Sequence, residues 1–150
     1  MRGAISEILP HLYIGTIYAA QSDDILRENQ IEHAISILDE DDFFNPVPSV
    51  KYLRYNIYDE PDEDIIPICE EVYVYLERNH SKDNPVKLLV HCAEGRSRSV
   101  CVVAYFLARC GMCNSVDDAL EFIKEKRLPV NIRPNVFFVD QITRKLKYKK

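Results

Sequence analysis

Residues 86 to 110 constrain this chain more than any other stretch. Val86 to Val90 is a short apolar run typical of a buried strand, and Ser99 to Cys110 is apolar enough to form a core helix. The loop between them, Cys92 to Arg98, consists of small and polar residues. A strand, a tight loop and a helix in this order turn the loop N–H groups toward the positive end of the helix dipole. The sequence therefore predicts an anion-binding loop.

This loop carries a thiol and a guanidinium that suit phosphate chemistry. We expect the Cys92 thiol to ionise readily, because cysteines at helix N-termini or beside cations are strongly acidified. Arg98 offers a planar fork of donors that matches two phosphate oxygens. The loop thus combines a thiolate nucleophile with a phosphate receptor. The alternative is a buried cysteine before a core helix, with arginines that lie on the surface.

Length and composition exclude several classes of protein. The 150 residues suffice for one domain with a real core, which we expect to span 1–146 and to be followed by a basic tail, 147–150. The net charge of −5 does not suggest a nucleic-acid partner. No apolar run approaches the roughly 20 residues that a membrane span needs. Five cysteines without framework spacing or a signal peptide predict a cytoplasmic or nuclear location.

Alternating strand and helix patterns predict a single α/β domain, with a central mixed sheet flanked by helices. The expected strands are two short pieces within 5–15 around Pro10, then 32–38, 51–58 and 86–90. The expected helices are 19–29 (with Ser22 as an alternative start), 65–79, 99–110, 115–127 and a last one with Pro134 in its first turn.

A phosphate-transfer site also needs a proton donor for the leaving oxygen. The acidic turn that follows the strand 51–58 offers Asp59, Asp62 and Asp64. If this strand lies parallel to 86–90, the two carboxyl ends open on the same edge of the sheet, where ligand crevices lie. Asp59 is then the favoured acid, Asp62 is the second candidate, and Asp64 is expected to start the next helix. A solvated surface turn is the alternative.

The motif His-Cys-x5-Arg-Ser, from His91 to Ser99, resembles the signature of the cysteine-dependent protein tyrosine phosphatases. The chain is most similar to the small atypical dual-specificity members, because it lacks room for the insertions that deepen the pocket of larger tyrosine-specific enzymes. The resemblance implies hydrolysis of phosphotyrosine and phosphoserine or phosphothreonine in a phosphoprotein, through a phosphocysteine, without cofactor or metal. It assigns phosphate binding to Ala93, Glu94, Gly95, Arg96, Ser97 and Arg98.

The same resemblance implies further roles. It makes Cys92 the nucleophile and Asp59 the acid, and Ser99 the hydroxyl that helps to release phosphate from cysteine. His91 is expected to brace the loop from a buried position. Asn135 matches a position that supports the loop, although Phe137 stands where the family usually has a small residue.

Other readings stay open. A lipid or nucleic-acid 5′-phosphatase of the same superfamily is disfavoured by Glu94 in the loop but not by Arg96. A non-catalytic phosphoprotein-binding module is a second alternative. The Cys110–Cys113 pair has C-x-x-C spacing but no second pair for zinc, so we interpret it as structural. Cys69 and Cys101 are expected in the core.

Overall fold

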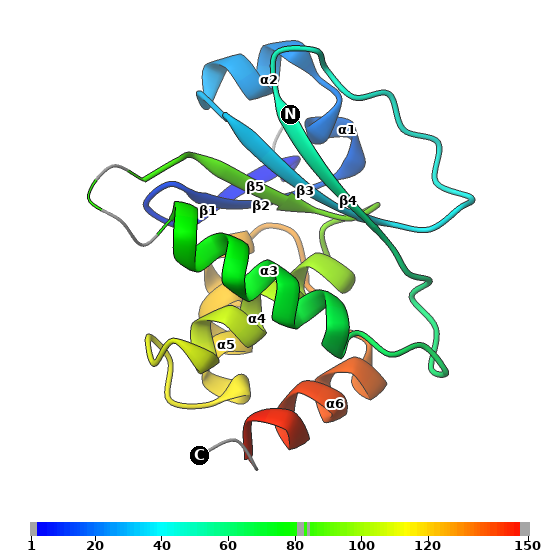
Figure 1. The fold of residues 1–150 in the computed structure, drawn as a ribbon, viewed down its shortest axis with the longest axis vertical. Coiled ribbons are helices and arrows are strands. Elements are labelled where there is room, and N and C mark those ends of the chain that lie inside the picture. The colour runs from blue at the N-terminus through cyan, green and yellow to red at the C-terminus, as the bar shows by residue number, and fades with distance from the viewer. Residues whose placement is uncertain (1–2, 81–82, 84, 148–150) are drawn as a thin grey trace.

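A five-stranded sheet lies at the centre of the computed structural model, which describes residues 3–80, 83 and 85–147 (Figure 1). Its strands are β1 (Ile5–Leu9), β2 (Leu12–Gly15), β3 (His33–Leu38), β4 (Lys51–Asn56) and β5 (Leu88–His91). They lie in the order β1-β2-β5-β3-β4. Only the edge strand β1 is antiparallel to its neighbour, and the other pairs are parallel. The predicted mixed sheet is confirmed, and Pro10 lies in the turn between β1 and β2.

Helices cover both faces of this sheet. They are α1 (Ile17–Ala20), α2 (Asp23–Glu28), α3 (Ile66–Asn79), α4 (Arg98–Arg109), α5 (Val116–Arg127) and α6 (Val136–Lys147). The short α1 and α2 lie on one face, and α3 to α6 lie on the other (Figure 1). Two apolar cores follow from this layering, a small one under α1 and α2 and a large one between the sheet and the longer helices.

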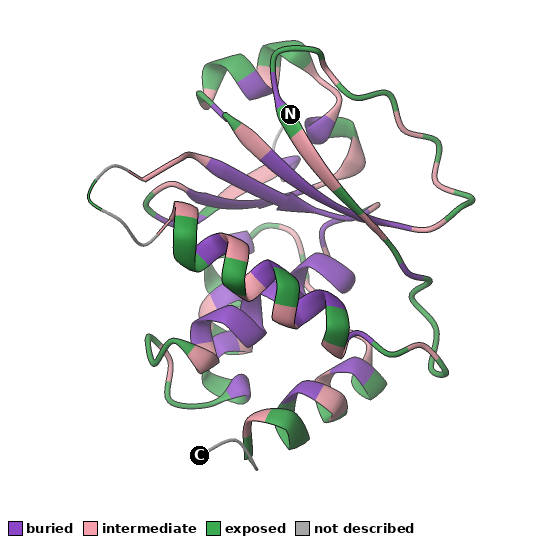
Figure 2. Ribbon diagram, viewed as in Figure 1, coloured by how far each residue is buried: buried purple, intermediate pink, exposed green. Residues whose placement is uncertain are grey.

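Helix α4 forms the centre of the large core. Every residue from Arg98 to Leu107 is buried, and Figure 2 shows this helix in the colour of buried residues along most of its length. It packs against α3, α5 and α6. A helix with neighbours on several sides needs apolar side chains around its whole circumference. This explains why the sequence after the loop is apolar, and it fixes the loop firmly to the core.

The predicted helix 19–29 is two helices. Ser22 has extended backbone angles (φ −100°, ψ 110°), and its hydroxyl accepts a hydrogen bond from the Ile25 N–H at 3.3 Å. This N-cap ends α1 and begins α2, because a serine side chain competes with helical hydrogen bonding. The single helix was therefore wrong, and the alternative start at Ser22 is confirmed.

Other element ends move by one or two residues. Strand β4 ends at Asn56 rather than residue 58, although the Ile57 N–H still donates to Leu38 O at 2.8 Å. Helix α6 begins two residues after Pro134 and includes Lys147, so the predicted tail starts inside it. Residues 148–150 of that tail lie outside the described residues. Among the described helices, none combines the length and the apolar character that a bilayer crossing requires.

Candidate active site

The predicted anion-binding loop, residues 92–97, joins β5 to α4 at the carboxyl edge of the parallel strands. Gly95 within it has φ +66°, a left-handed conformation that favours glycine. A Cβ atom at this position would lie 2.4 Å from Arg127 Nη2 and 2.7 Å from Gly15 O. Backbone angle and close packing therefore both require glycine here.

The carbonyl groups of the loop are all bonded away from its interior. Cys92 O lies 3.1 Å from His91 Nδ1, and Ser97 O accepts from the Cys101 N–H. Between them, Ala93 O accepts from the Ile17 N–H and Arg96 O from the Arg133 N–H. Glu94 O and Gly95 O both accept from the Arg127 guanidinium. The backbone N–H groups of residues 93–97, by contrast, have no partner among the described residues. Free donors at the start of a helix form an anion cradle.

Cys92 lies at the base of this loop, with 3% of its surface exposed. Its Sγ is 3.2 Å from the Ser99 hydroxyl in the first turn of α4. The structure thus brings together two residues that the sequence assigned to nucleophile and leaving-group assistance. A hydroxyl at this distance can donate to a thiolate and stabilise it.

His91 is fully buried at the end of β5, beneath the loop. Burial lowers the pKa of its imidazole to about 4, so the ring is neutral near pH 7. A neutral ring has one donor and one acceptor nitrogen. Because Nδ1 faces Cys92 O, it must donate, and Nε2 accepts from the Ser36 hydroxyl at 2.6 Å. His91 therefore connects β3 to the loop, in the position that the sequence predicted.

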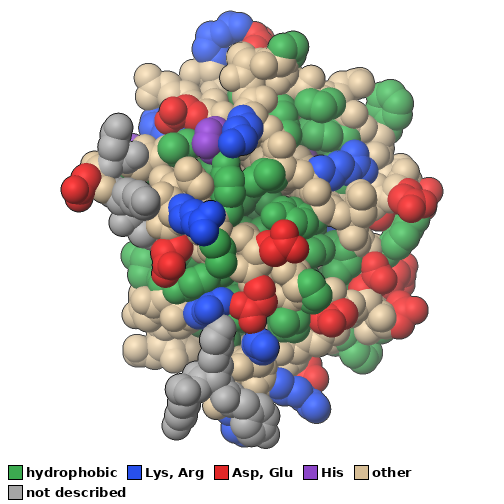
Figure 3. Space-filling view, in the orientation of Figure 1, with side chains coloured by type: hydrophobic (Ala, Val, Ile, Leu, Met, Phe, Trp, Pro, Cys, Tyr) green, Lys and Arg blue, Asp and Glu red, His purple; other side chains and the backbone are tan. Residues whose placement is uncertain are grey.

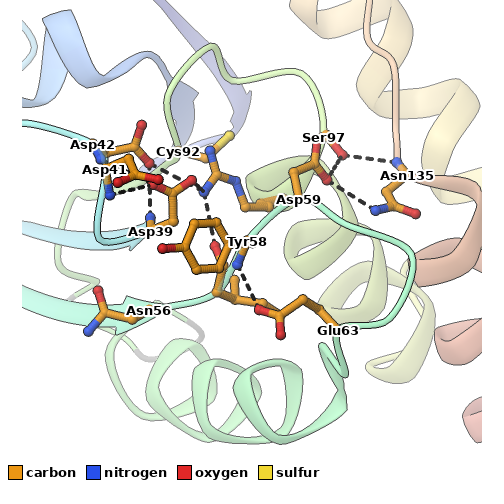
Figure 4. Close-up of polar contacts among 12 residues, drawn as sticks. Asp39, Asp41, Asp42, Asn56, Tyr58, Asp59, Glu63, Cys92, Ser97 and Asn135 are labelled. Atoms are coloured by element: carbon orange, nitrogen blue, oxygen red, sulfur yellow. Dashed lines mark hydrogen bonds and ion pairs between the residues drawn. The ribbon is translucent and has the colours of Figure 1, made fainter.

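Arg98 is buried, and two carboxylates hold one end of its guanidinium. Its Nη1 donates to Asp39 Oδ2 and Asp42 Oδ2, both at 3.3 Å, and to Ile57 O at 3.0 Å (Figure 4). Its Nε is buried and has no partner among the described residues. Leaving a buried donor without a partner is costly. An anion in the adjacent cavity would supply the missing acceptor.

Asp59 lies on the loop after β4 and contacts the phosphate-binding loop directly. Its Oδ1 accepts from the Ser97 hydroxyl at 2.8 Å and from Asn135 Nδ2 at 3.3 Å (Figure 4). The Asn135 N–H in turn donates to Ser97 Oγ at 2.9 Å. Asp59 Oδ2 has no hydrogen-bond partner among the described residues. The sequence placed this residue directly after the strand, and the structure places it three residues beyond the end of β4.

The other acids of this turn lie elsewhere. Asp62 is exposed and does not line the loop cavity, whereas Asp64 Oδ1 accepts from the Ile66 N–H at the start of α3, as expected. Glu63 Oε2 accepts from the Tyr58 N–H at 2.8 Å (Figure 4). This contact closes the turn and helps to fix the neighbouring Asp59.

The loop forms the wall of a cavity of about 370 Å³. Asp59 and Arg133 line it from outside the loop; the lining residues within the loop and α4 are Cys92, Ala93, Glu94, Arg96, Ser97 and Arg98. Gly95 is the one predicted phosphate-binding residue that is not among them. Arg96 also pairs with Glu94 at 3.7 Å. The cavity therefore combines a thiol, a carboxyl group and guanidinium groups.

Sequence reasoning missed the residues that position this chemistry. Asp39 follows β3, a neighbour of β5, so the strand-end argument used for Asp59 could have found it. Asp42 had no such signal. Arg127 stands in the last turn of α5, where a basic residue is already explained by the helix dipole. The two cysteines expected in the core, Cys69 and Cys101, are fully buried.

Comparison with known proteins agrees with this geometry. The family model described as "Dual specificity phosphatase, catalytic domain" matches residues 12–147. Protein phosphatase Slingshot homolog 3 of Mus musculus is 31% identical over 138 residues, which cover 91% of this chain and 20% of that protein. Dual specificity protein phosphatase 16 of Homo sapiens is also 31% identical over 138 residues, with the same coverage. The chain thus spans about a fifth of the length of these relatives.

Solved structures share the fold over nearly the whole chain. The human tyrosine phosphatase-like serine/threonine/tyrosine-interacting protein has a TM-score of 0.85 at 28% identity, with 97% of each chain covered. A mouse protein assigned as a dual specificity phosphatase, complexed with zinc tungstate, has a TM-score of 0.81 at 26% identity, with 98% of this chain and 91% of that chain covered. From its sequence match and its fold, the chain belongs to the dual specificity phosphatase catalytic domain family.

Proposed function

We propose that this chain is a protein phosphatase that hydrolyses phosphotyrosine and phosphoserine or phosphothreonine through a phosphocysteine intermediate. The observation that carries the proposal is the loop 92–97. Its carbonyls are all bonded outward, its N–H groups from 93 to 97 lack partners among the described residues, and a thiol lies at its base. These are the parts that a thiol-based phosphate transfer requires.

In the first step the Cys92 thiolate attacks phosphorus, the S–P bond forms, and the P–O bond to the leaving oxygen breaks. The loop N–H groups and Arg98 stabilise the negative charge on the equatorial oxygens. Asp59 donates a proton to the leaving oxygen. Asp59 Oδ2 suits this role, because the two hydrogen bonds to the Asp59 carboxyl group, from Ser97 and Asn135, are both accepted by Oδ1.

In the second step a water molecule attacks the phosphocysteine, the S–P bond breaks, and inorganic phosphate is released. Asp59, now ionised, accepts the proton of that water. The Ser99 hydroxyl, 3.2 Å from Cys92 Sγ, donates to the departing thiolate. His91 holds the loop from below without titrating near pH 7, because burial lowers its pKa to about 4.

The charge on the loops after β3 and β4 favours a protein substrate over a highly charged phosphate ester. The loops after β3 and β4 carry the exposed acids Glu40, Asp41, Glu60 and Asp62. Figure 3 shows acidic side chains gathered on the right-hand side, where Figure 1 places these loops. These acids disfavour a polyanionic lipid headgroup or a nucleic acid and attract basic residues that flank a phosphorylated side chain, while Arg96, Arg98 and Arg133 in the cavity lining attract the phosphate group itself. The tungstate complex of the mouse neighbour supports oxyanion binding in this fold.

The test compares phosphopeptides, phosphoinositides and a generic aryl phosphate as substrates of the wild-type chain and of Cys92→Ser. We expect the wild type to release phosphate from the peptides. Cys92→Ser should bind inorganic phosphate without hydrolysis, because backbone donors and Arg98 remain. Turnover by Cys92→Ser would refute the assigned nucleophile. Phosphopeptide binding without turnover by the wild type would instead support the binding-module alternative.

We also propose a cytoplasmic or nuclear location, with a role in phosphorylation-dependent signalling. All five cysteines are free in the structure, which agrees with a reducing compartment. Fluorescence microscopy of the tagged chain tests the location.

A further inference from the structure

Arg127, the last residue of α5, lies completely buried behind the phosphate-binding loop, with 0% of its surface exposed. Its Nε donates to Gly95 O at 3.1 Å and its Nη2 to Glu94 O at 3.4 Å. Its Nη1 donates to Gly3 O at 2.6 Å and to the Ser6 hydroxyl at 2.9 Å. The guanidinium therefore joins the N-terminal segment and β1 to the back of the loop.

All four acceptors of Arg127 are neutral, and no ion pair joins this guanidinium to a carboxylate among the described residues. This is unusual, because buried charges are normally paired. Burial lowers the pKa of Arg127 to about 10, so the guanidinium still carries its charge near pH 7. The charge of Cys92 opposes the effect of burial and raises the pKa of Arg127, whereas the charge of Arg96 lowers it further. The guanidinium is bonded to Glu94 O and Gly95 O, which belong to the same loop that carries Cys92 at its base.

We propose that Arg127 is a positioning residue for the phosphate-transfer reaction and the counter-charge of the Cys92 thiolate. Its fork holds the carbonyls of Glu94 and Gly95 on the outer side of the loop, which leaves the N–H groups free for phosphate. Its charge stabilises the thiolate from the side opposite the substrate. Unlike Arg98, it contributes this charge without contacting the phosphate.

Packing supports a fixed position for this side chain. A Cβ atom at Gly95 would lie 2.4 Å from Arg127 Nη2, so the guanidinium fits against a glycine and against no larger residue. Lysine would retain the charge but not the fork, because its ammonium is a point charge on a flexible stem. Charge and geometry can therefore be separated by substitution.

Several other titratable or charged groups lie near Cys92. His91 and Cys101 lie in the core below and are neutral near pH 7, since burial lowers the pKa of the imidazole and raises that of the Cys101 thiol. The charged groups that share the cavity with Cys92 are Asp59, Glu94, Arg96, Arg98 and Arg133. Arg127→Lys controls for any movement of these groups, because it releases the same loop carbonyls while keeping the charge.

The experiment measures the rate of alkylation of Cys92 by iodoacetamide against pH, followed by mass spectrometry of the peptide that contains it. In Arg127→Met, we expect the midpoint of the pH profile to rise by roughly 1–3 pH units, which slows alkylation at low pH on the order of tenfold or more. Arg127→Lys should keep a midpoint near that of the wild type, yet lose much of its kcat, because the loop carbonyls are released. Lys124→Met, which removes a charge from the exposed side of the same helix, should change neither.

An unchanged midpoint in a folded Arg127→Met variant would overturn the proposal, and so would equal midpoint shifts in the Met and Lys variants. Because Arg127→Met can fail to fold, a wild-type measurement stands beside it. The NMR signal of the Arg127 Nε–H group should shift as Cys92 ionises, and this shift should vanish in Cys92→Ser. A signal that does not respond to Cys92 would refute the counter-charge.

The inference rests on the proposed phosphatase function but is tested separately from it. Alkylation requires only a thiolate, not turnover. A wild-type chain that hydrolyses nothing, yet shows the Arg127-dependent midpoint, would refute the function and support the counter-charge. A chain that hydrolyses phosphopeptides with an Arg127-independent midpoint would do the reverse.

Discussion

Replacement of Asp59 by asparagine should remove proton donation while leaving the site intact. The two hydrogen bonds to Asp59 are received by Oδ1, from Ser97 and Asn135. An asparagine carbonyl oxygen can accept both, so the side chain keeps its place. Its amide group stands where Oδ2 was and cannot protonate a leaving oxygen. We therefore expect kcat to fall while KM and the free energy of unfolding change little.

The magnitude follows from the role of the proton. Positioned acid–base groups contribute about 10²–10⁴-fold, which corresponds to about 2.7–5.4 kcal/mol of activation free energy. A serine or tyrosine oxygen is a poor leaving group and should suffer the full loss. An activated phenol leaves without a proton, so turnover of an activated aryl phosphate should fall by less. The ratio of the two losses identifies the acid.

The assay is a pair of pH–rate profiles for Asp59→Asn and for the matched variant Asp62→Asn, whose exposed side chain does not line the cavity. The basic limb should flatten in Asp59→Asn and persist in Asp62→Asn. The acidic limb, which reports the nucleophile and the substrate, should persist in both. A basic limb that flattens only in Asp62→Asn would refute the assigned acid. If neither variant flattens it, the acid lies outside this turn.

Three further changes test the surroundings of the loop. Asp42→Asn keeps an acceptor near Arg98 but removes one charge that competes with phosphate; inhibition by inorganic phosphate should strengthen on the order of tenfold, and unchanged inhibition would contradict this. Gly95→Ala should lower the free energy of unfolding by about 1–3 kcal/mol in a denaturant titration and should also lower activity, because residue 95 has a positive φ and its Cβ would meet Arg127. Wild-type stability of this variant would refute the close packing. The pKa of His91 is lowered to about 4 in the folded state, so between about pH 6.5 and pH 4 only the unfolded state binds a proton at this residue, and the free energy of unfolding falls as the pH falls through this window. At pH 5 the wild type should have lost about 2 kcal/mol more of its free energy of unfolding than His91→Gln. Equal losses in the two proteins would show that His91 titrates normally.

The sequence alone determined the reactive loop. Its strand, loop and helix are contiguous, so the apolar runs on either side of Cys92 were sufficient to place them. The spacing from Cys92 to Arg98 and Ser99 is likewise local, and the structure brings Sγ and the Ser99 hydroxyl within 3.2 Å. The mixed sheet also followed from the alternation of strand and helix patterns, whereas the parallel direction of β4 and β5 was only a condition of the Asp59 argument until the structure showed it.

The boundaries of helices and strands were predicted less accurately than their presence. Ser22 was seen as a possible helix start, but the same pattern was also compatible with one helix from 19 to 29. Strand β4 ends two residues before the predicted end, because a strand boundary depends on its partner β3 rather than on its own residues. The loop that carries Asp59 is correspondingly longer.

Only the tertiary structure decided which side chains support the loop. Arg98 binds Asp39 and Asp42, which are more than fifty residues away in the chain, and Arg127 reaches Gly95 across 32 positions. No local pattern marks such contacts, because they arise from the packing of α4 and α5 behind the sheet. The sequence thus supplied the nucleophile and the phosphate receptor. The fold supplied the buried charges around them, since burial strengthens charge interactions that would be weak in water.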